Sequence, residues 1–466
     1  MGKGKYFYSK GEGNDGYIKN LEVLSYCDMD GTCGMFQMGL YRTEAGRYLL
    51  YGACFAAGPD GVGIMISDVT DPRNPVFIKK WRPFDIEEYP TTSIPKLQIA
   101  DDKLIFALTS GSGPAVLVGD RDKMKSLQGI MIYDLKNDPE NPEYLGYWDC
   151  GVPYSMGVHR FMYNGGDYVH LSSEADEFEG LIYRIVSIAD PANPVEVGRW
   201  WAPHQYIYGV PGREVDHSAP HNPDFMDKGW LHGPPFVVGD KVYCGYCGDG
   251  LYVLDISDIT HPKALGNLKF MPAFSSRLAG ARTHTALPLV GRDLVVVTNE
   301  GERFGFIKDG VVKQAQAMNN LHMVDVSDPT NPVLIAEFPY PEVPEDFPAP
   351  NFNVYCLAEG SKGGPFGPHN VHEPMSNKPW LEQRTDVVYD CYFAAGLRVY
   401  DVSDPFYIKE KAYFIPPNPT KKCFPFPGPM MAMTEDVVVD DRGNIIIDAN
   451  SDGFYILRKT YEDEDH

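Results

Sequence analysis

The stretch LHMVDVSDPTNPVLIAEF, from Leu321 to Phe338, sets a pattern to which the chain keeps returning. An apolar strand leads into a tight Asp-Pro turn, and a second strand of alternating apolar residues follows. Asp and Asn cap their own backbone two residues on, and Pro fixes φ, so the turn is specified locally. Five further copies share this pattern and begin at Ile66, Ile132, Val186, Leu254 and Val399.

Each copy has the same kind of partner upstream. The segment LPLVGRDLVVVTNEG, from Leu287 to Gly301, is an alternating strand, a turn and then a β-branched run. With the two strands of the copy itself, this makes a repeating unit of four strands, A to D in chain order. Four-stranded units in series are typical of a β-propeller, whose strand A lies nearest the central axis.

The two ends of the chain share one unit. Residues 433–459 supply strands A, B and C and then stop, whereas residues 18–28 have the spacing of a strand D. Pairing them closes the ring and removes exposed sheet edges. We therefore predict an all-β, seven-bladed β-propeller that forms one domain over residues 1–466. Its N-terminal strand, at about 18–28, completes the last blade, at about 430–459.

Composition limits the partners and the compartment. The net charge of −23 disfavours nucleic acid and anionic membranes, which would repel the chain. The N-terminus has no apolar signal region and no run of 18 apolar residues occurs, so we expect a cytoplasmic protein. In that compartment we expect the nine cysteines to be mostly free thiols. We expect Cys244 and Cys247, which form the single CxxC motif, to be ordinary core or turn residues. The oligomeric state stays open.

Four histidines share one position in the repeat. His159, His232 and His284 each lie seven residues before the glycine of their A–B turn, and His369 opens the corresponding strand of the next blade. Strand A is innermost, so four successive blades should direct imidazoles at one small volume near the axis. A single histidine would more often be an ordinary core residue, but four in register predict a transition-metal site.

Carboxylates fall at the same end of the blades, because strand B returns to the face where strand A began. Glu174 and Glu300 stand there and are candidates for fixing a histidine tautomer, for a metal ligand, or for a general acid or base. The long connections 111–128, 202–231, 301–320, 339–367 and 415–430 also join strands on this face. Long loops in a compact domain are usually functional, so we expect them to cover a largely apolar pocket.

The remaining histidines carry weaker signals. His204, His217 and His221 lie in one long connection, and His372 follows His369; their roles stay open, as does that of Glu302. His170, His261 and His322 share no register and are expected to be structural, and His466 belongs to the tail. The repeated Asp of the DVSDP turns is better explained by turn capping than by catalysis.

The copies GLYVLDISD, GLRVYDVSDP and LHMVDVSDPTNP resemble the LVIVD repeat, a bacterial and archaeal propeller repeat. The resemblance covers nearly the whole chain and implies the propeller fold, but it implies little about function. The usual repeat has a small or apolar residue where His159, His232, His284 and His369 stand. Two other propeller families are similar in carrying axial histidines. These are the carotenoid-cleavage-type dioxygenases, with Fe(II) on four histidines, and the selenium-binding-protein-type oxidases, whose PH-x-VH stretch is similar to Pro368 to His372.

These patterns favour a metalloenzyme with one mononuclear non-haem metal ion held by His159, His232, His284 and His369. By analogy with the four-histidine propellers, iron is favoured over manganese, zinc or copper. The substrate would be a small, partly apolar molecule, and the chemistry that of an oxygenase or oxidase. Two alternatives stay open: a redox-neutral metal-dependent hydrolase, lyase or hydratase, and a non-catalytic propeller that serves as an interaction scaffold.

Overall fold

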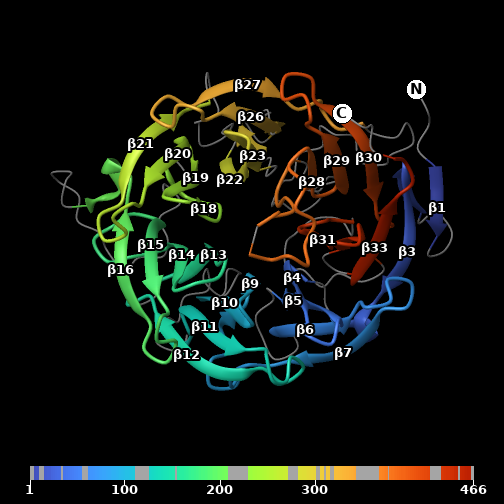
Figure 1. The fold of residues 1–466 in the computed structure, drawn as a ribbon, viewed down its shortest axis with the longest axis horizontal. Helices are drawn as coiled ribbons and strands as arrows, with labels where there is room; N and C mark the ends of the chain where they lie inside the picture. The colour runs from blue at the N-terminus through green and yellow to red at the C-terminus, as the bar shows by residue number, and fades with distance from the viewer. Residues whose placement is uncertain are drawn as a thin grey trace.

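Seven antiparallel sheets surround a central axis in the computed structural model of the chain (Figure 1). The structure describes residues 5–9, 15–32, 35–54, 61–110, 125–152, 155–207, 229–270, 282–300, 305–308, 311–314, 320–342, 367–375, 377–419, 432–449 and 452–462. The predicted fold class, a seven-bladed β-propeller closed by an N-terminal strand, is confirmed.

The first three blades each follow the order A to D from the axis outward. Blade 1 consists of β4 (Gln37–Arg42), β5 (Tyr48–Cys54), β6 (Gly63–Asp68) and β7 (Val76–Trp81). Blade 2 consists of β9 (Leu97–Ala100), β10 (Lys103–Ser110), β11 (Gly129–Asp134) and β12 (Glu143–Asp149), and the short β8 (Thr92–Ser93) also pairs with β10. Blade 3 consists of β13 (Val158–Met162), β14 (Tyr168–Ser173), β15 (Ile182–Ser187) and β16 (Val195–Trp200).

The next two blades depart slightly from this plan. In blade 4, strand A is split into β17 (Trp230–Leu231) and β18 (Phe236–Val238), followed by β19 (Lys241–Cys247), β20 (Gly250–Asp255) and β21 (Lys263–Leu268). Blade 5 consists of β22 (Arg282–Leu289), β23 (Leu294–Glu300), β26 (Leu321–Asp325) and β27 (Val333–Glu337). Between its strands B and C lies the hairpin of β24 (Gly305–Lys308) and β25 (Val311–Gln314).

The last two blades take strands from both ends of the chain. In blade 6, residues 369–372 serve as strand A beside β28 (Val387–Cys391), β29 (Leu397–Asp401) and β30 (Lys409–Ile415). Blade 7 consists of β31 (Val437–Val439), β32 (Ile445–Asp448), β33 (Phe454–Lys459) and the N-terminal β3 (Leu21–Cys27). The pairing of β3 with β33 closes the ring, and Figure 1 shows the two side by side.

The N-terminal segment does more than the sequence predicted. The predicted strand at 18–28 is in fact two strands, because Asn20 adopts a left-handed conformation (φ 57°) that breaks it. Before the break, β2 (Asp15–Lys19) adds to the outer edge of blade 6 by pairing with β30, and β1 (Lys5–Ser9) pairs with β2. The N-terminus therefore joins two neighbouring blades.

The Asp-Pro turns are capped as their sequence predicts. Asp328 Oδ1 accepts a hydrogen bond from the backbone N–H of Thr330 at 3.0 Å, and Asp71 does the same for Arg73 at 2.9 Å. The turns also join the blades: a Cβ at Gly198 in strand D of blade 3 would meet the carbonyl oxygen of Ile259 at 1.9 Å. The turn of the next blade thus packs directly on this backbone.

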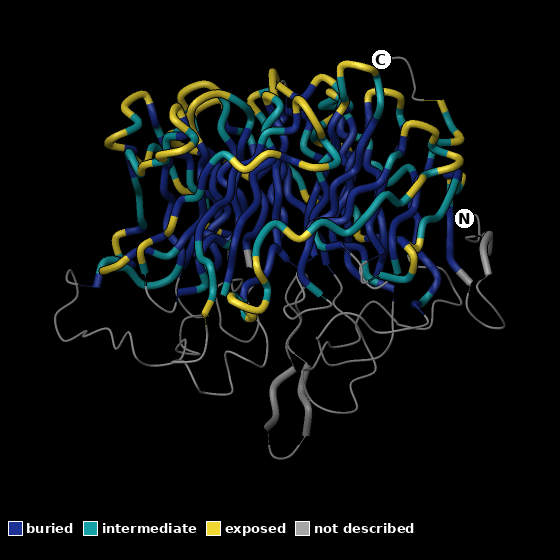
Figure 2. The backbone as a smooth tube through the Cα atoms, turned by 90° about the horizontal axis from the view of Figure 1, so that it is seen from below, coloured by how far each residue is buried: buried dark blue, intermediate teal, exposed yellow. Residues whose placement is uncertain are grey.

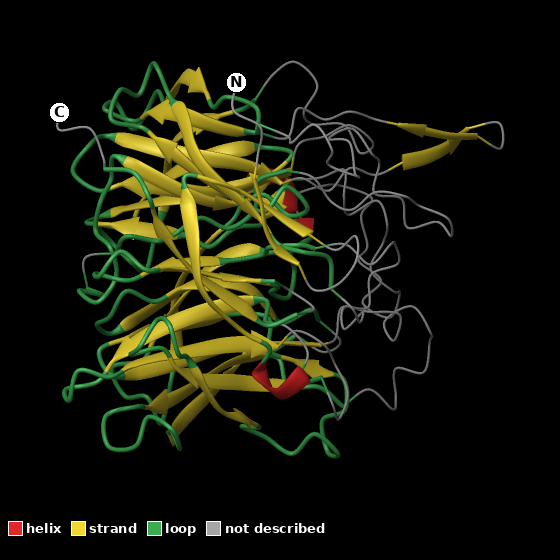
Figure 3. Cartoon of the chain, turned by 90° about the vertical axis from the view of Figure 1, so that its right-hand side faces the viewer, coloured by secondary structure: helices red, strands yellow, loops and turns green. Residues whose placement is uncertain are grey.

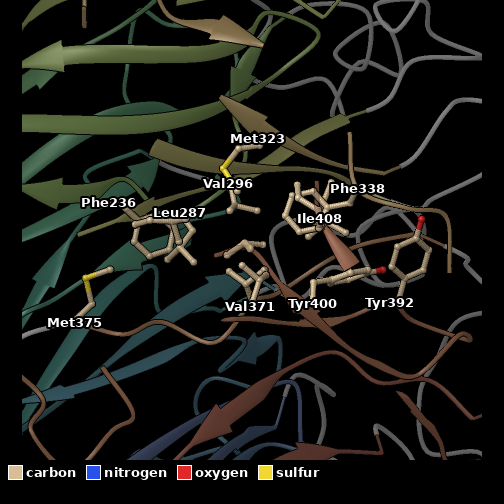
Figure 4. Packing of buried hydrophobic residues seen from close by; sticks show 14 of the residues in the cluster. Phe236, Leu287, Val296, Met323, Phe338, Val371, Met375, Tyr392, Tyr400 and Ile408 are labelled. Carbon is tan, nitrogen blue, oxygen red and sulfur yellow. The ribbon is translucent and has the colours of Figure 1, made fainter. Parts of the chain in front are cut away.

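Apolar side chains fill the space between neighbouring sheets. One cluster joins blades 4, 5 and 6 and includes Phe236, Leu287, Val371 and Tyr400 (Figure 4). Figure 2 shows buried strands throughout the ring and exposed turns along one rim. The part of the chain that the structure describes contains only two helical turns, η1 (Met29–Gly31) and η3 (Pro203–Gln205) (Figure 3). None of its helices is long and apolar enough to cross a membrane.

Candidate metal centre

Each of the histidines in blades 3 to 5 lies where strand A is irregular. The register of β13 against β14 shifts between Val158 and Arg160, at His159. The register of β22 against β23 shifts between Thr283 and Ala286, at His284. His232 lies in the gap between β17 and β18, where the N–H groups of His232 and Gly233 both donate to the carbonyl of Gly245. Such bulges turn side chains away from the regular pleat and are common beside active sites.

The four imidazoles that share a register form a continuous arc around the axis. The ring centroids of His159 and His232 are 5.2 Å apart, those of His232 and His284 are 4.5 Å apart, and those of His284 and His369 are 4.7 Å apart. His232, His284 and His369 are buried, whereas His159 is partly exposed. The shared position in the repeat thus correctly predicted that these four histidines, far apart in the sequence, lie next to one another.

Three groups within this arc are placed to hold a metal ion. His232, His284 and Glu300 each offer one ligand atom, and these atoms lie within 4.8 Å of one another. Glu300 is the last residue of β23, and its Oε2 lies 3.3 Å from Nε2 of His232. Two imidazoles and one carboxylate with further positions open form the ligand set of non-haem Fe(II) sites.

Hydrogen bonds fix the tautomer of His284. With the hydroxyl of Thr285 donating to the carbonyl of His369 at 3.2 Å, its oxygen accepts the bond from Nδ1–H of His284 at 2.7 Å. Nε2 of His284 then carries the lone pair, and this buried atom has no hydrogen-bond partner among the described residues. Burial, and then the charge of Arg160, hold the pKa of His284 well below its usual range. The ring is therefore neutral, as a candidate metal ligand needs to be.

Two glycines of blade 4 fix the position of this histidine. A Cβ at Gly233 would meet the carbonyl oxygen of His284 at 1.9 Å, and one at Gly245 would meet it at 2.0 Å. Only glycine allows so close an approach of two backbones. These glycines place the bulge of blade 5 directly against blade 4, and with it the imidazole of His284 beside that of His232.

His369 uses its ring differently. Its Nδ1–H donates to the carbonyl of Glu435 at 2.9 Å, so Nε2 carries the lone pair and accepts a hydrogen bond from Nη2 of Arg160 at 2.8 Å. An imidazole nitrogen cannot bind a metal ion and accept this bond at the same time. Ligation by His369 therefore stays a prediction, and it requires Arg160 to move.

The two predicted carboxylates have separate environments. Glu300 touches the arc of imidazoles, with its Oε1 3.6 Å from Nε2 of His369. Glu174 follows β14, and its Oε2 accepts a hydrogen bond from the backbone N–H of Met156 at 3.0 Å. The structure does not group Glu174 with the three candidate ligands.

The remaining histidines fall outside the arc. His372 accepts a hydrogen bond from the N–H of Val439 at Nδ1 and donates from Nε2 to the carbonyl of Glu382, so both of its ring nitrogens are used. His204 contacts the carbonyl of Gly229 at 2.8 Å. His217, His221 and Glu302 lie outside the described residues, as do most of the five long connections, so their predicted covering role stays a prediction.

Sequence reasoning missed the partners of the imidazoles. Sγ of Cys247 lies 3.2 Å from Nδ1 of His232. Cys247 is the second cysteine of the CxxC motif, for which the sequence predicted only a core or turn position. Arg160 directly follows His159, and this adjacency was the available signal. Lys96 does not share the repeat position of the four histidines, and no other feature of the repeat indicated it.

The opposite side of the axis carries charge instead of imidazoles. Lys96, Glu435, Asp436 and Asp448 come from blades 2 and 7, and all are buried. Burial raises the pKa of Asp436 to about 7 and that of Asp448 well above its usual range, and it lowers the pKa of Lys96 strongly. A cavity beside them is lined by residues of the inner strands, including Gln98, Val371, Glu373 and Asp436.

Comparison with known proteins finds one family match and two similar solved structures. The LVIVD repeat matches residues 236–269 and 315–338, in blades 4 and 5. The chain is similar in structure to the crystal structure of RRP9 WD40 repeats, with 8% identity, a TM-score of 0.46, and coverage of 94% of this chain and 97% of that chain. It is also similar to the crystal structure of the Myceliophteria thermophila Cps50 (Swd1) beta-propeller domain, with 11% identity, a TM-score of 0.49, and coverage of 94% and 99%.

A search of the curated proteins finds no match. The sheet topology and the repeat matches together identify the chain as a seven-bladed β-propeller that carries LVIVD repeats.

Proposed function

We propose that this propeller is a metal-dependent enzyme whose axis holds one transition-metal ion through His232, His284 and Glu300. The observation that carries the proposal is the grouping of these three buried ligand atoms within 4.8 Å. The lone pair of His284 Nε2, buried and without a hydrogen-bond partner among the described residues, fits a bound cation. His159 and His369 flank the three ligands and are candidates for a fourth.

The ligand set favours Fe(II). Two imidazoles and a carboxylate leave coordination positions open, and in proteins this combination is typical of iron sites that activate oxygen. A bound Fe(II) would supply O₂ chemistry, so we propose an oxidoreductase, acting on a small and partly apolar molecule. The six described cysteines are free thiols, which supports our placing the protein in the cytoplasm.

The experiment is anaerobic reconstitution of metal-free protein with Fe(II), followed by addition of nitric oxide as an analogue of O₂. We expect about one Fe(II) per chain and a high-spin iron–nitrosyl signal in the electron paramagnetic resonance spectrum. The matched control for the ligand variant His284→Ala is His322→Gln. His322 is a buried histidine of the same blade, and its Nε2 contacts Asn299 outside the arc. This variant should give the full signal.

A protein that binds Zn(II) or Mn(II) but not Fe(II) would contradict the oxidoreductase proposal and favour Lewis-acid chemistry. A protein that binds none of these ions would contradict the metal site itself.

A further inference from the structure

Three buried donor groups near the candidate ligands have no acceptor among the described residues. They are Nζ of Lys96, Nε of Arg160 and Nδ2 of Asn370, and we call these three residues the donor cluster. Their exposed fractions are 1%, 2% and 5%. A buried donor that gives up water without finding an acceptor is costly, and folded proteins rarely tolerate one. Three together indicate that a ligand supplies the acceptors.

The donor cluster is continuous with the arc of imidazoles. Nη1 of Arg160 donates to Oδ1 of Asn370 at 2.5 Å, and Nη2 donates to Nε2 of His369. Nζ of Lys96 lies 3.7 Å from the centre of the Phe36 ring, and Phe36 contacts the ring of His369. Phe36 thus lies between Lys96 and His369, and the charges of Arg160 and Lys96 both act on the candidate ligand His284.

The charges of the buried carboxylates Glu435 and Asp436 act on both Lys96 and Arg160. Among the described residues, however, no acceptor receives a hydrogen bond from Nζ of Lys96 or from Nε of Arg160. The nearby carboxylates have other partners: Oδ2 of Asp436 accepts from the N–H of Met38 at 2.7 Å, and Oδ1 of Asp448 accepts from the N–H of Glu435 at 2.7 Å. The N–H groups of a buried cation need acceptors in addition to a nearby opposite charge, and here a ligand would supply those acceptors.

The surroundings select among anions. Glu300 and Glu435 both contact the ring of His369, so a multiply charged anion such as phosphate would meet repulsion there. A guanidinium and an amide present donors that suit a planar carboxylate. Phe36 and Phe393, whose ring centroid lies 4.6 Å from that of His369, offer apolar surface to the rest of the molecule.

We propose that the donor cluster binds the carboxylate of a small monocarboxylic acid with an apolar body, and so holds this substrate beside the metal. The proposal rests on the proposed function for the identity of the reacting centre, but the binding of the carboxylate needs no metal.

The test is calorimetric titration of the full-length, metal-free protein with benzoate, propionate, benzamide and inorganic phosphate. We expect benzoate or propionate to bind, and benzamide and phosphate to bind at least about tenfold more weakly, because each lacks the single matching negative charge. Benzamide has nearly the shape of benzoate, so this comparison isolates the charge without any mutation.

Lys96→Met should weaken carboxylate binding at least about tenfold, the effect of losing one charge-assisted hydrogen bond. Lys378→Met is the matched control, because Lys378 is a second buried lysine, and its Nζ already donates to Oε1 of Gln98. It should bind as the wild type does. Failure of both carboxylates to bind, equal binding of benzamide, preference for phosphate, or wild-type affinity in folded Lys96→Met would each overturn the proposal.

Metal uptake by the same preparations after reconstitution separates this proposal from the previous one. Carboxylate binding by a chain that takes up no metal would support the donor cluster and contradict the metal site. A metal-loaded chain that binds no carboxylate would do the reverse.

Discussion

The two sides of the propeller axis are built from the same repeated strand, yet they carry different chemistry. Blades 3 to 6 present His159, His232, His284 and His369, each ring in contact with the next. Blades 7 and 2 present buried carboxylates and Lys96. On the imidazole side, the lone pair of His284 Nε2 has no hydrogen-bond partner among the described residues; on the other side, Nζ of Lys96 has no acceptor there. The imidazoles with Glu300 suit a cation, whereas the donor cluster, which combines Lys96 of blade 2 with Arg160 and Asn370 of blades 3 and 6, suits an anion.

The difference shows where function enters a repeat protein. The Asp-Pro turns and alternating strands are common to the blades and build the ring. The residues that distinguish the two sides lie at bulges and strand ends, where the repeat does not dictate the side chain. A change at such a position should alter binding while the ring persists.

The largest effect is expected from Glu300→Gln. The substitution keeps the size of the side chain and removes the charge of the one carboxylate among the three candidate ligands. We expect metal affinity to fall at least about 100-fold, which is roughly the part of the binding free energy that one ligand contributes in a structural metal site. Competition with a chelator measures this. Glu174→Gln is the matched control and should leave the affinity unchanged; an equal loss in both variants would mean that the imidazole side is not the metal site.

Gly233→Ala tests how the imidazole side is held in place. The new Cβ would collide with the carbonyl oxygen of His284, so we expect unfolding free energy to fall by about 3 kcal/mol. Gly239→Ala meets nothing within 4 Å and strains only a left-handed turn (φ 60°), so it should cost about 1 kcal/mol. Urea unfolding measures both, and equal losses would show that the close approach is not what fixes His284.

Acid should weaken the fold through its buried histidines. Burial lowers the pKa of His322 to about 4, whereas an unfolded imidazole titrates near 6.5. Between these values the unfolded chain binds more protons, so stability falls as pH drops from about 6.5 toward 4. The loss from His322 is about 2 kcal/mol at pH 5.

The matching variant is His322→Gln, whose side-chain oxygen can still accept from Asn299. Its unfolding free energy should change less than that of the wild type between pH 7 and pH 5. Comparing the two proteins removes the opposite contribution of Asp436, whose raised pKa favours the folded state as pH falls. An unchanged pH dependence would show that His322 is not held neutral.

The smallest effect is expected from Cys247→Ala. It removes the sulfur next to Nδ1 of His232 without touching a candidate ligand. Losing such an orienting contact should weaken metal binding about tenfold. Cys244→Ala, at the other buried cysteine of the CxxC, should leave metal affinity unchanged. The same chelator competition gives both values, and a stronger effect at Cys244 would assign the CxxC a different role.

The sequence predicted the ring well, because the signals for it are local and repeated. Turn capping by Asp328 and its equivalents, and the period of the strands, require no knowledge of distant contacts. The same register placed four histidines in one arc. It could not reveal that Arg160 occupies Nε2 of His369, or that Asn20 splits the N-terminal strand between two blades. These depend on the orientations of side chains and on pairing across the whole chain.

The central claim is that the axis binds one metal ion through His232, His284 and Glu300. The most direct measurement is the metal content of untagged wild-type protein and of His284→Ala, with circular dichroism to confirm that both are folded. We predict about one transition-metal ion per wild-type chain and a nearly complete loss in the folded variant. Equal metal content in the two proteins, or none in the wild type after reconstitution, would contradict the account.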